Sequence, residues 1–144
     1  MLSIPKEMDY GILILLELTQ ARKNQVIAAT KMAEKTGLPY QHVAKLMKKL
    51  QRGGVLESVM GPKGGYRLQQ LPEEITLNDI YNVLFGKVSL TDCTRDHSVQ
   101  KGCLKKNTCS LVPHVTMINQ IIKQEFSRIT LSKLNEKNVT SIGV

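Results

Sequence analysis

Three cysteines lie close together in the sequence and are the residues best suited to bind a metal. Cys93, Cys103 and Cys109 fall within 17 residues of the 144-residue chain and are its only cysteines. Lysines lie among them, and positively charged neighbours favour the thiolate, which is the form of cysteine that binds metal. Because thiolates select zinc, copper(I) or iron–sulfur clusters, the segment 91–110 is a candidate metal site.

Inert thiols, a structural zinc site and an iron–sulfur cluster are the three possibilities for this segment. Inert thiols usually have apolar neighbours, whereas the residues around these cysteines are polar or charged. Structural zinc sites usually contain a pair of closely spaced cysteines, which is absent here. Iron–sulfur clusters accept longer, irregular loops and would order a segment that has almost no apolar periodicity. The chemistry therefore favours an iron–sulfur cluster, of two-iron or four-iron form.

Three cysteines leave a fourth ligand to be identified. His97 and His114 are near the cysteines in sequence. Asp9 lies far away on the first expected helix and reaches the cysteines only through folding or dimerisation. The residue types alone leave this choice open.

Positive charge is the second chemical feature of the chain. It has 20 Lys+Arg against 12 Asp+Glu and a formal net charge of +8. The net charge is +6 over residues 1–72 and +2 over residues 73–144. Residues 45–67 contain one acidic residue, Glu57, and six basic ones: Lys45, Lys48, Lys49, Arg52, Lys63 and Arg67. Such a cluster is typical of a surface that binds phosphates, so we expect a polyanionic partner.

The apolar pattern predicts the elements that must position these residues. A helix over residues 5–21 is apolar nearly all round and is therefore buried. Two short helices, from Val26 to Gly37 and from Pro39 to Gly53, make a helix-turn-helix. Apolar segments on either side of the turn at 61–65 then predict a β-hairpin. A helix-turn-helix followed by a hairpin with a basic, glycine-rich tip is a winged helix.

The predicted DNA-contacting residues lie on the second of these short helices and on the wing. The polar face of the helix carries side chains that can contact bases and phosphates: Gln41, His42, Lys45, Lys48 and Lys49. Lys63 at the tip of the wing and Arg67 beyond it are suited to the DNA backbone. These positions predict binding of double-stranded DNA.

A second region follows Pro72. A capping box at Thr76 starts a helix that stops at Gly86. From Pro113, apolar residues step by three and four along a long helix: Val115, Ile118, Ile122, Phe126 and Ile129. That seam is suited to packing against a partner helix. The expected fold is mainly α with a small β-hairpin: a winged helix-turn-helix domain (1–72), then a cluster-binding loop and a dimerisation helix (73–144).

Several functional classes are excluded by the sequence. No apolar stretch approaches the roughly 20 residues that span a bilayer, and no secretory signal opens the chain, so we expect a cytoplasmic protein without a membrane partner. No nucleophile elbow, phosphate-binding loop or zinc-protease motif is present, so we expect no enzymatic activity.

Four segments carry a family signature. They are Met8–Gly11, Gly61–Leu68, the three-cysteine segment and Ile129–Leu134. Together they resemble the Rrf-two family of bacterial winged-helix transcription regulators over residues 1 to about 136. Within that family the chain looks most like the regulators of the Suf iron–sulfur assembly system, because Leu90–Cys93, the wide first cysteine gap and Cys109–His114 match that branch. The family's iron–sulfur assembly repressor and nitric-oxide sensor are similar but have a shorter first gap.

The resemblance implies a homodimer whose long C-terminal helices pair and whose loops each hold a cluster through the three cysteines. The assembly repressor's histidine ligand falls here at Val112, so it does not transfer to His114. Asp9 stands where the nitric-oxide sensor supplies a carboxylate from the partner subunit's first helix. Asp9 is therefore the first choice for the fourth ligand, with His114 as the alternative. Met60 replaces the arginine that family members commonly insert into the minor groove.

The sequence thus predicts a transcriptional repressor whose affinity for a pseudo-palindromic operator is switched by an iron–sulfur cluster, in response to cluster supply or to redox and oxygen stress. A nitric-oxide-sensing repressor of the same family and a non-sensing dimeric module with a structural zinc site are the alternatives.

Overall fold

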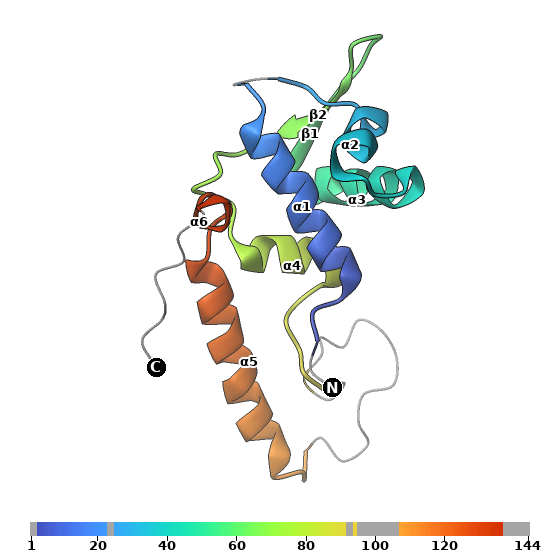
Figure 1. Ribbon diagram of the computed structural model, residues 1–144. Helices are drawn as coiled ribbons and strands as arrows, with labels where there is room; N and C mark the ends of the chain where they lie inside the picture. Colours follow the sequence, from blue (N-terminus) through green and yellow to red (C-terminus); the bar gives the residue numbers. More distant parts are fainter. Residues whose placement is uncertain (1–2, 23–24, 92–93, 95–106, 137–144) are drawn as a thin grey trace.

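The computed structural model describes residues 3–22, 25–91, 94 and 107–136 (Figure 1). The elements are α1 (Lys6–Gln20), α2 (Ala29–Thr36), α3 (Tyr40–Arg52), β1 (Leu56–Val59), β2 (Gly65–Leu68), α4 (Leu77–Phe85), α5 (Leu111–Arg128) and α6 (Leu131–Asn135). This mainly helical fold with one two-stranded hairpin confirms the expected fold class. None of the helices in the described part of the chain has the length and hydropathy needed to span a bilayer.

The helix-turn-helix is formed by α2 and α3. Gly37 ends α2 in the left-handed region, with φ of 69°, and its backbone N–H donates to Ala33 O. Glycine is favoured there because it has no Cβ to strain that conformation. Pro39 then precedes the first turn of α3, which ends at Gly53. The predicted turn and both of these helix ends are confirmed.

The wing is an antiparallel hairpin that projects from the helical body in Figure 1. Its register pairs Leu56 with Leu68, Glu57 with Arg67, Ser58 with Tyr66 and Val59 with Gly65. Leu56 and Ser58 lie on the same face of β1, but Leu56 is buried in the core and Ser58 is exposed, so the strand leaves the core along its length. The loop between the strands, residues 60–64, therefore lies at the far end of the projection.

The segment before α2 differs from the prediction. A helix was expected to begin at Val26, but α2 begins at Ala29. Ile27 instead makes an antiparallel bridge with Tyr66, in which each backbone N–H donates to the other residue's carbonyl at 2.9 Å. Gly65 permits this approach, since a Cβ there would lie 2.5 Å from the Ile27 carbonyl. The pairing joins residues far apart in sequence, so the local spacing of apolar residues did not reveal it.

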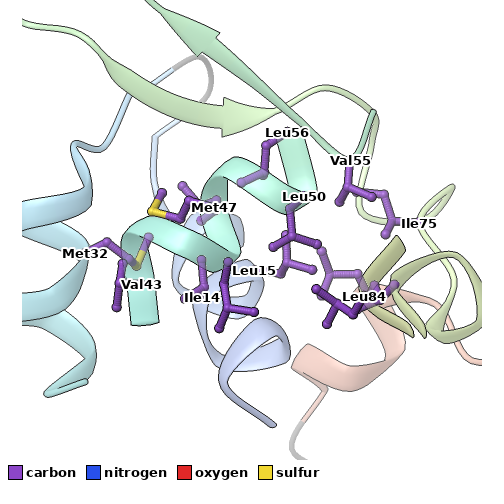
Figure 2. Close-up of a cluster of buried hydrophobic side chains, with 14 of the residues drawn as sticks. Ile14, Leu15, Met32, Val43, Met47, Leu50, Val55, Leu56, Ile75 and Leu84 are labelled. Carbon is purple, nitrogen blue, oxygen red and sulfur yellow. The ribbon is translucent and has the colours of Figure 1, made fainter. Parts of the chain in front are cut away.

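One hydrophobic core joins the regions before and after residue 72. Figure 2 shows Ile14 and Leu15 of α1 beside Leu50 of α3 and Leu84 of α4, and all four are fully buried or nearly so. Ile75 and Leu131 belong to the same cluster. The DNA-binding motif is thus held against α4 and α6 by continuous apolar packing.

Most of the seam predicted on the long C-terminal helix faces this chain's own core. Val115 is buried, and Phe126 packs on Tyr81 of α4 with ring centroids 5.8 Å apart. Ile118 alone of the predicted helical seam is exposed. Apolar spacing identifies a face of a helix but not what covers it, and here α4 covers it. The large apolar side chains that α5 exposes, Ile118 of the seam among them, are Leu111, Met117, Ile118 and Ile121.

Candidate nucleic-acid interface and metal-binding segment

The helix α3 is amphipathic: its inner face contributes to the core and its outer face is polar. Val43, Leu46, Met47 and Leu50 are buried on one side of the helix. The opposite side presents exposed side chains that were predicted to contact DNA: Gln41, His42, Lys45 and Lys48. These residues share one solvent-facing surface, which we call the α3 outer face.

Two contacts from α1 touch this face. The Lys45 Nζ donates to Glu7 Oε1 at 2.9 Å, which forms an ion pair at the protein surface. The hydrogen bond from Lys45 lowers the pKa of the Glu7 carboxyl below its usual value. The His42 ring lies edge-on to Tyr10, with centroids 6.1 Å apart. The first two turns of α1 therefore fix two side chains of the α3 outer face.

Lys49 does not lie on the α3 outer face with the other lysines. Its Nζ donates to the Leu84 carbonyl near the end of α4 and lies 5.8 Å from the centre of the Phe85 ring. A positive charge is favourable at a helix C-terminus, where carbonyl groups lack intrahelical partners. The structure thus places Lys49 in the packing of α3 on α4, whereas the sequence predicted a phosphate contact.

The two basic residues of the wing also differ in their surroundings. Lys63 is exposed in the loop at the tip, and Met60 at the base of that loop is 91% exposed. Arg67 instead pairs with Glu57 on the neighbouring strand. Opposite charges directly across an antiparallel pair stabilise a hairpin, so the position of Arg67 favours a structural role over a DNA contact.

The α3 helix and the wing, which carry the predicted DNA contacts, lie at the same end of the molecule. Figure 1 shows α2, α3 and the hairpin at one end, with α5 extending toward the other. A major groove admits an α-helix, so α3 can enter it while Lys63 reaches the adjacent backbone. This arrangement is suited to double-stranded DNA.

Only part of the candidate metal segment belongs to the described residues. Cys93, Cys103 and His97 lie outside them, and Cys109 is a free, half-buried thiol just ahead of α5. His114 is exposed on the first turns of α5, and Asp9 is exposed on the first turn of α1. Within the described ranges, no three His, Cys, Asp or Glu side chains converge. A cysteine thiol is a soft donor of the kind that binds zinc, copper(I) or iron–sulfur clusters.

Two residues that the sequence reasoning missed contribute to these parts of the structure. Glu7 forms the ion pair with Lys45, and Asn119 is buried on α5 with its amide hydrogen-bonded to Leu90 and Thr94. Asn119 could have been identified from the sequence, because it is a polar residue inside the apolar seam, between Val115 and Ile122. The pattern gave no comparable signal for Glu7, because acidic residues are ordinary in the first turn of a helix.

Comparison with known proteins places the chain among transcriptional regulators. The Rrf2 family model, described as an iron-dependent transcriptional regulator, matches residues 4–137. The regulator NsrR of Shouchella clausii is 28% identical over 105 residues, which are 73% of this chain and 65% of that protein. The chain therefore spans slightly less than two thirds of that relative's length.

Solved structures share the fold. The structure of CymR, the global cysteine regulator of B. subtilis, superimposes with a TM-score of 0.70 at 24% identity, over 96% of this chain and all of that one. T. potens IscR gives a TM-score of 0.69 at 22% identity, over 99% of this chain and 93% of that one. Since the family model covers nearly the whole sequence and the winged-helix fold agrees, the chain belongs to the Rrf2 (Rrf-two) family of transcriptional regulators.

Proposed function

We propose that the chain is a dimeric, DNA-binding transcriptional repressor whose operator affinity is switched by an iron–sulfur cluster. The α3 outer face, together with Lys63 on the projecting wing, is the observation that carries the DNA-binding part. Gln41 and His42 lie near the start of α3, where side chains reach base edges in the major groove. Lys45 and Lys48 follow toward the phosphates.

Dimerisation is supported by the apolar surface of α5. Leu111, Met117, Ile118 and Ile121 are 55%, 54%, 42% and 50% exposed, although large apolar side chains on one helix are normally covered. A second copy of α5 would cover them. Two-fold symmetry would then place two α3 helices on a pseudo-palindromic operator, with half-sites about one helical turn or a multiple of it apart.

The sensing part of the proposal assigns Cys93, Cys103 and Cys109 as cluster ligands. Asp9 of the partner subunit is proposed as the fourth ligand, with His114 as the alternative. When bound, a cluster supplies iron–sulfur bonds that oxygen, nitric oxide or iron shortage can break. The three thiolates would hold a cluster just ahead of α5 in the sequence, so a change in their ligation would change the restraint on the chain that enters this helix.

A second candidate is a regulator whose DNA affinity responds to a signal other than the state of an iron–sulfur cluster. One structural relative is named the global cysteine regulator of B. subtilis, which supports this possibility. A zinc clip that only holds a dimer together is the further alternative. Three cysteines within 17 residues of the sequence, just ahead of α5, favour the cluster.

DNA binding is tested by fluorescence anisotropy with a labelled duplex at several salt concentrations. Lys48→Glu and Lys63→Glu should each weaken binding and reduce the slope of log affinity against log salt by about 0.9 for each phosphate that the variant no longer neutralises. Lys123→Glu is the matched control, because it makes the same charge change at an exposed position on α5. An equal loss of affinity in all three variants would leave only a general charge effect and contradict the assigned surface.

Metal content separates the sensing candidates. Anaerobic purification followed by an absorption spectrum and by iron and acid-labile sulfide analysis should give iron with sulfide. Stoichiometric zinc would support the clip instead, and protein without metal would support the second candidate, a regulator that responds to another signal. A Cys93→Ala protein that keeps the visible absorption after anaerobic reconstitution would remove Cys93 from the ligand set.

A further inference from the structure

Asn119 is a buried amide on the apolar side of α5. Its side chain belongs to a residue only 9% exposed, on the face that Val115 and Phe126 use for packing. Burying an amide costs free energy unless both its donor and its acceptor find partners. The partners of Asn119 therefore indicate why a polar residue stands at this position.

Both ends of the Asn119 amide bind residues on either side of Cys93 in the sequence. Its Oδ1 accepts a hydrogen bond from the Leu90 N–H at 3.0 Å, and its Nδ2 donates to Thr94 Oγ1 at 2.9 Å. A carboxylate would lose the donor and an aliphatic side chain would lose both groups. An amide is the side chain that matches a backbone donor on one side and a hydroxyl acceptor on the other.

The hydroxyl of Thr94 closes this turn on itself. Thr94 Oγ1 donates to the Thr91 carbonyl at 3.0 Å and lies 2.9 Å from Ser89 Oγ. Ser89 Oγ donates to the same carbonyl at 2.7 Å, and the Thr94 backbone N–H does so at 3.1 Å. Residues 89–91 and Thr94 thus form one hydrogen-bonded unit, and Asn119 joins that unit to α5.

The other end of the cysteine segment is attached to the same helix. The Val112 N–H donates to the Cys109 carbonyl at 3.4 Å, just where α5 begins. The start of the helix at Leu111 and the anchor at Asn119 are eight residues apart, or about 12 Å along the axis. Since α5 also packs on α4 through Phe126 and Tyr81, a displacement of α5 reaches the body that holds α3.

We propose that Asn119 is a positioning residue, which anchors to α5 the turn of residues 89–91 and Thr94, on either side of Cys93 in the sequence, and transmits to that helix whether the cysteines are ligated. The anchor stands on the described contacts alone, whereas what it transmits rests on the proposed cluster. The two parts are therefore tested by separate measurements.

The anchor is tested by amide hydrogen exchange in the metal-free protein. Asn119→Leu keeps the number and branching of the side-chain heavy atoms but removes both hydrogen bonds, so the Leu90 amide should exchange roughly tenfold faster. Thr94→Val should loosen the same turn, and Thr94→Ser, which keeps the hydroxyl, should restore wild-type exchange. Thr116→Val is the matched control, because the Thr116 hydroxyl bonds only within α5, to the Val112 carbonyl. An unchanged Leu90 exchange rate in both Asn119→Leu and Thr94→Val would overturn the anchor.

Transmission is tested by anaerobic reconstitution with ferrous iron and sulfide. Reconstitution of the wild-type protein should slow exchange along α5 and change DNA affinity, and Asn119→Leu with the same iron content should lose at least two thirds of both changes. A variant that retains both would refute transmission through Asn119. Wild-type protein that takes up no iron would refute the cluster instead, and the Leu90 measurement would still decide the anchor.

Discussion

Replacing Glu7 by glutamine should tighten DNA binding, because Glu7 competes with phosphate for a lysine of the α3 outer face. The Lys45 Nζ lies 2.9 Å from Glu7 Oε1, and the side chains are 63% and 36% exposed, respectively. When α3 enters a groove, Lys45 must exchange this carboxylate for a phosphate oxygen. In Glu7→Gln that exchange no longer breaks an ion pair.

The size of the effect follows from the exposure of the pair. Surface ion pairs contribute about 0.2–1 kcal/mol, which corresponds to a factor of roughly 1.4–5 in affinity for each protomer. Two independent copies in a dimer multiply to roughly 2–30-fold tighter binding. The salt slope should stay constant, because the number of phosphates contacted is the same.

Fluorescence anisotropy with one duplex at several salt concentrations measures both quantities. Glu34→Gln is the matched control, because Glu34 forms a similar exposed ion pair with Lys31 on α2 at 2.9 Å. It makes the same charge change away from α3. Lys45→Gln should lower the salt slope by about 0.9. Glu7→Gln that binds no tighter than Glu34→Gln, or Lys45→Gln that binds like wild type, would refute the competition.

Three further outcomes concern stability. Because the hydrogen bond from Lys45 lowers the pKa of Glu7, the stability contributed by this ion pair is present above the ordinary value of 4.5 and is lost as pH falls through the lowered pKa. In urea unfolding, wild type should be more stable than Glu7→Gln by at most about 1 kcal/mol at pH 7. The two proteins should be equally stable well below pH 4. Gly65→Ala should lower the free energy of unfolding by about 1–3 kcal/mol, because its Cβ would lie 2.5 Å from the Ile27 carbonyl; unchanged thermal denaturation would contradict this close approach. Lys49→Met should lower stability by about 1–2 kcal/mol without changing the salt slope, whereas a slope reduced by about 0.9 would restore Lys49 as a phosphate contact.

The winged helix could be predicted because most of its signals are local. Gly37 and Pro39 mark one turn, and glycines on both sides of Lys63 mark the other, so spacing alone gives their order. The bridge between Ile27 and Tyr66 is not local and was therefore missed. The long helix was found for the same local reason, but the partner of its seam depends on where α4 packs.

Helical periodicity predicts which side of α3 is polar, but it does not separate residues at neighbouring angles around the helix. Lys49 is rotated about 40° from Lys45 around α3, which is too little for the pattern to separate them. That rotation brings Lys49 to the flank of α3, next to α4. His42 stands at a similar angle around α3 but stays exposed, with its ring edge-on to Tyr10 of α1. Neighbouring helices, and not the spacing along α3, thus decide which polar residues remain free for DNA.

If Asp9 is a ligand, the first turns of α1 offer a second route from the cysteines to the DNA surface. Asp9, the proposed fourth ligand, lies between Glu7 and Tyr10, which contact Lys45 and His42 of α3. Ligation by Asp9 would restrain the turn that carries both contacts, without passing through α5.

The two routes make different predictions for reconstituted protein. Asp9→Asn should diminish the effect of reconstitution on DNA affinity while α5 still becomes more protected from exchange, whereas Asn119→Leu should diminish both. In the double variant, losses that add in free energy would indicate two independent routes. A double variant no more impaired than Asn119→Leu would show that α1 carries no signal of its own, because every effect of ligation would then pass through α5.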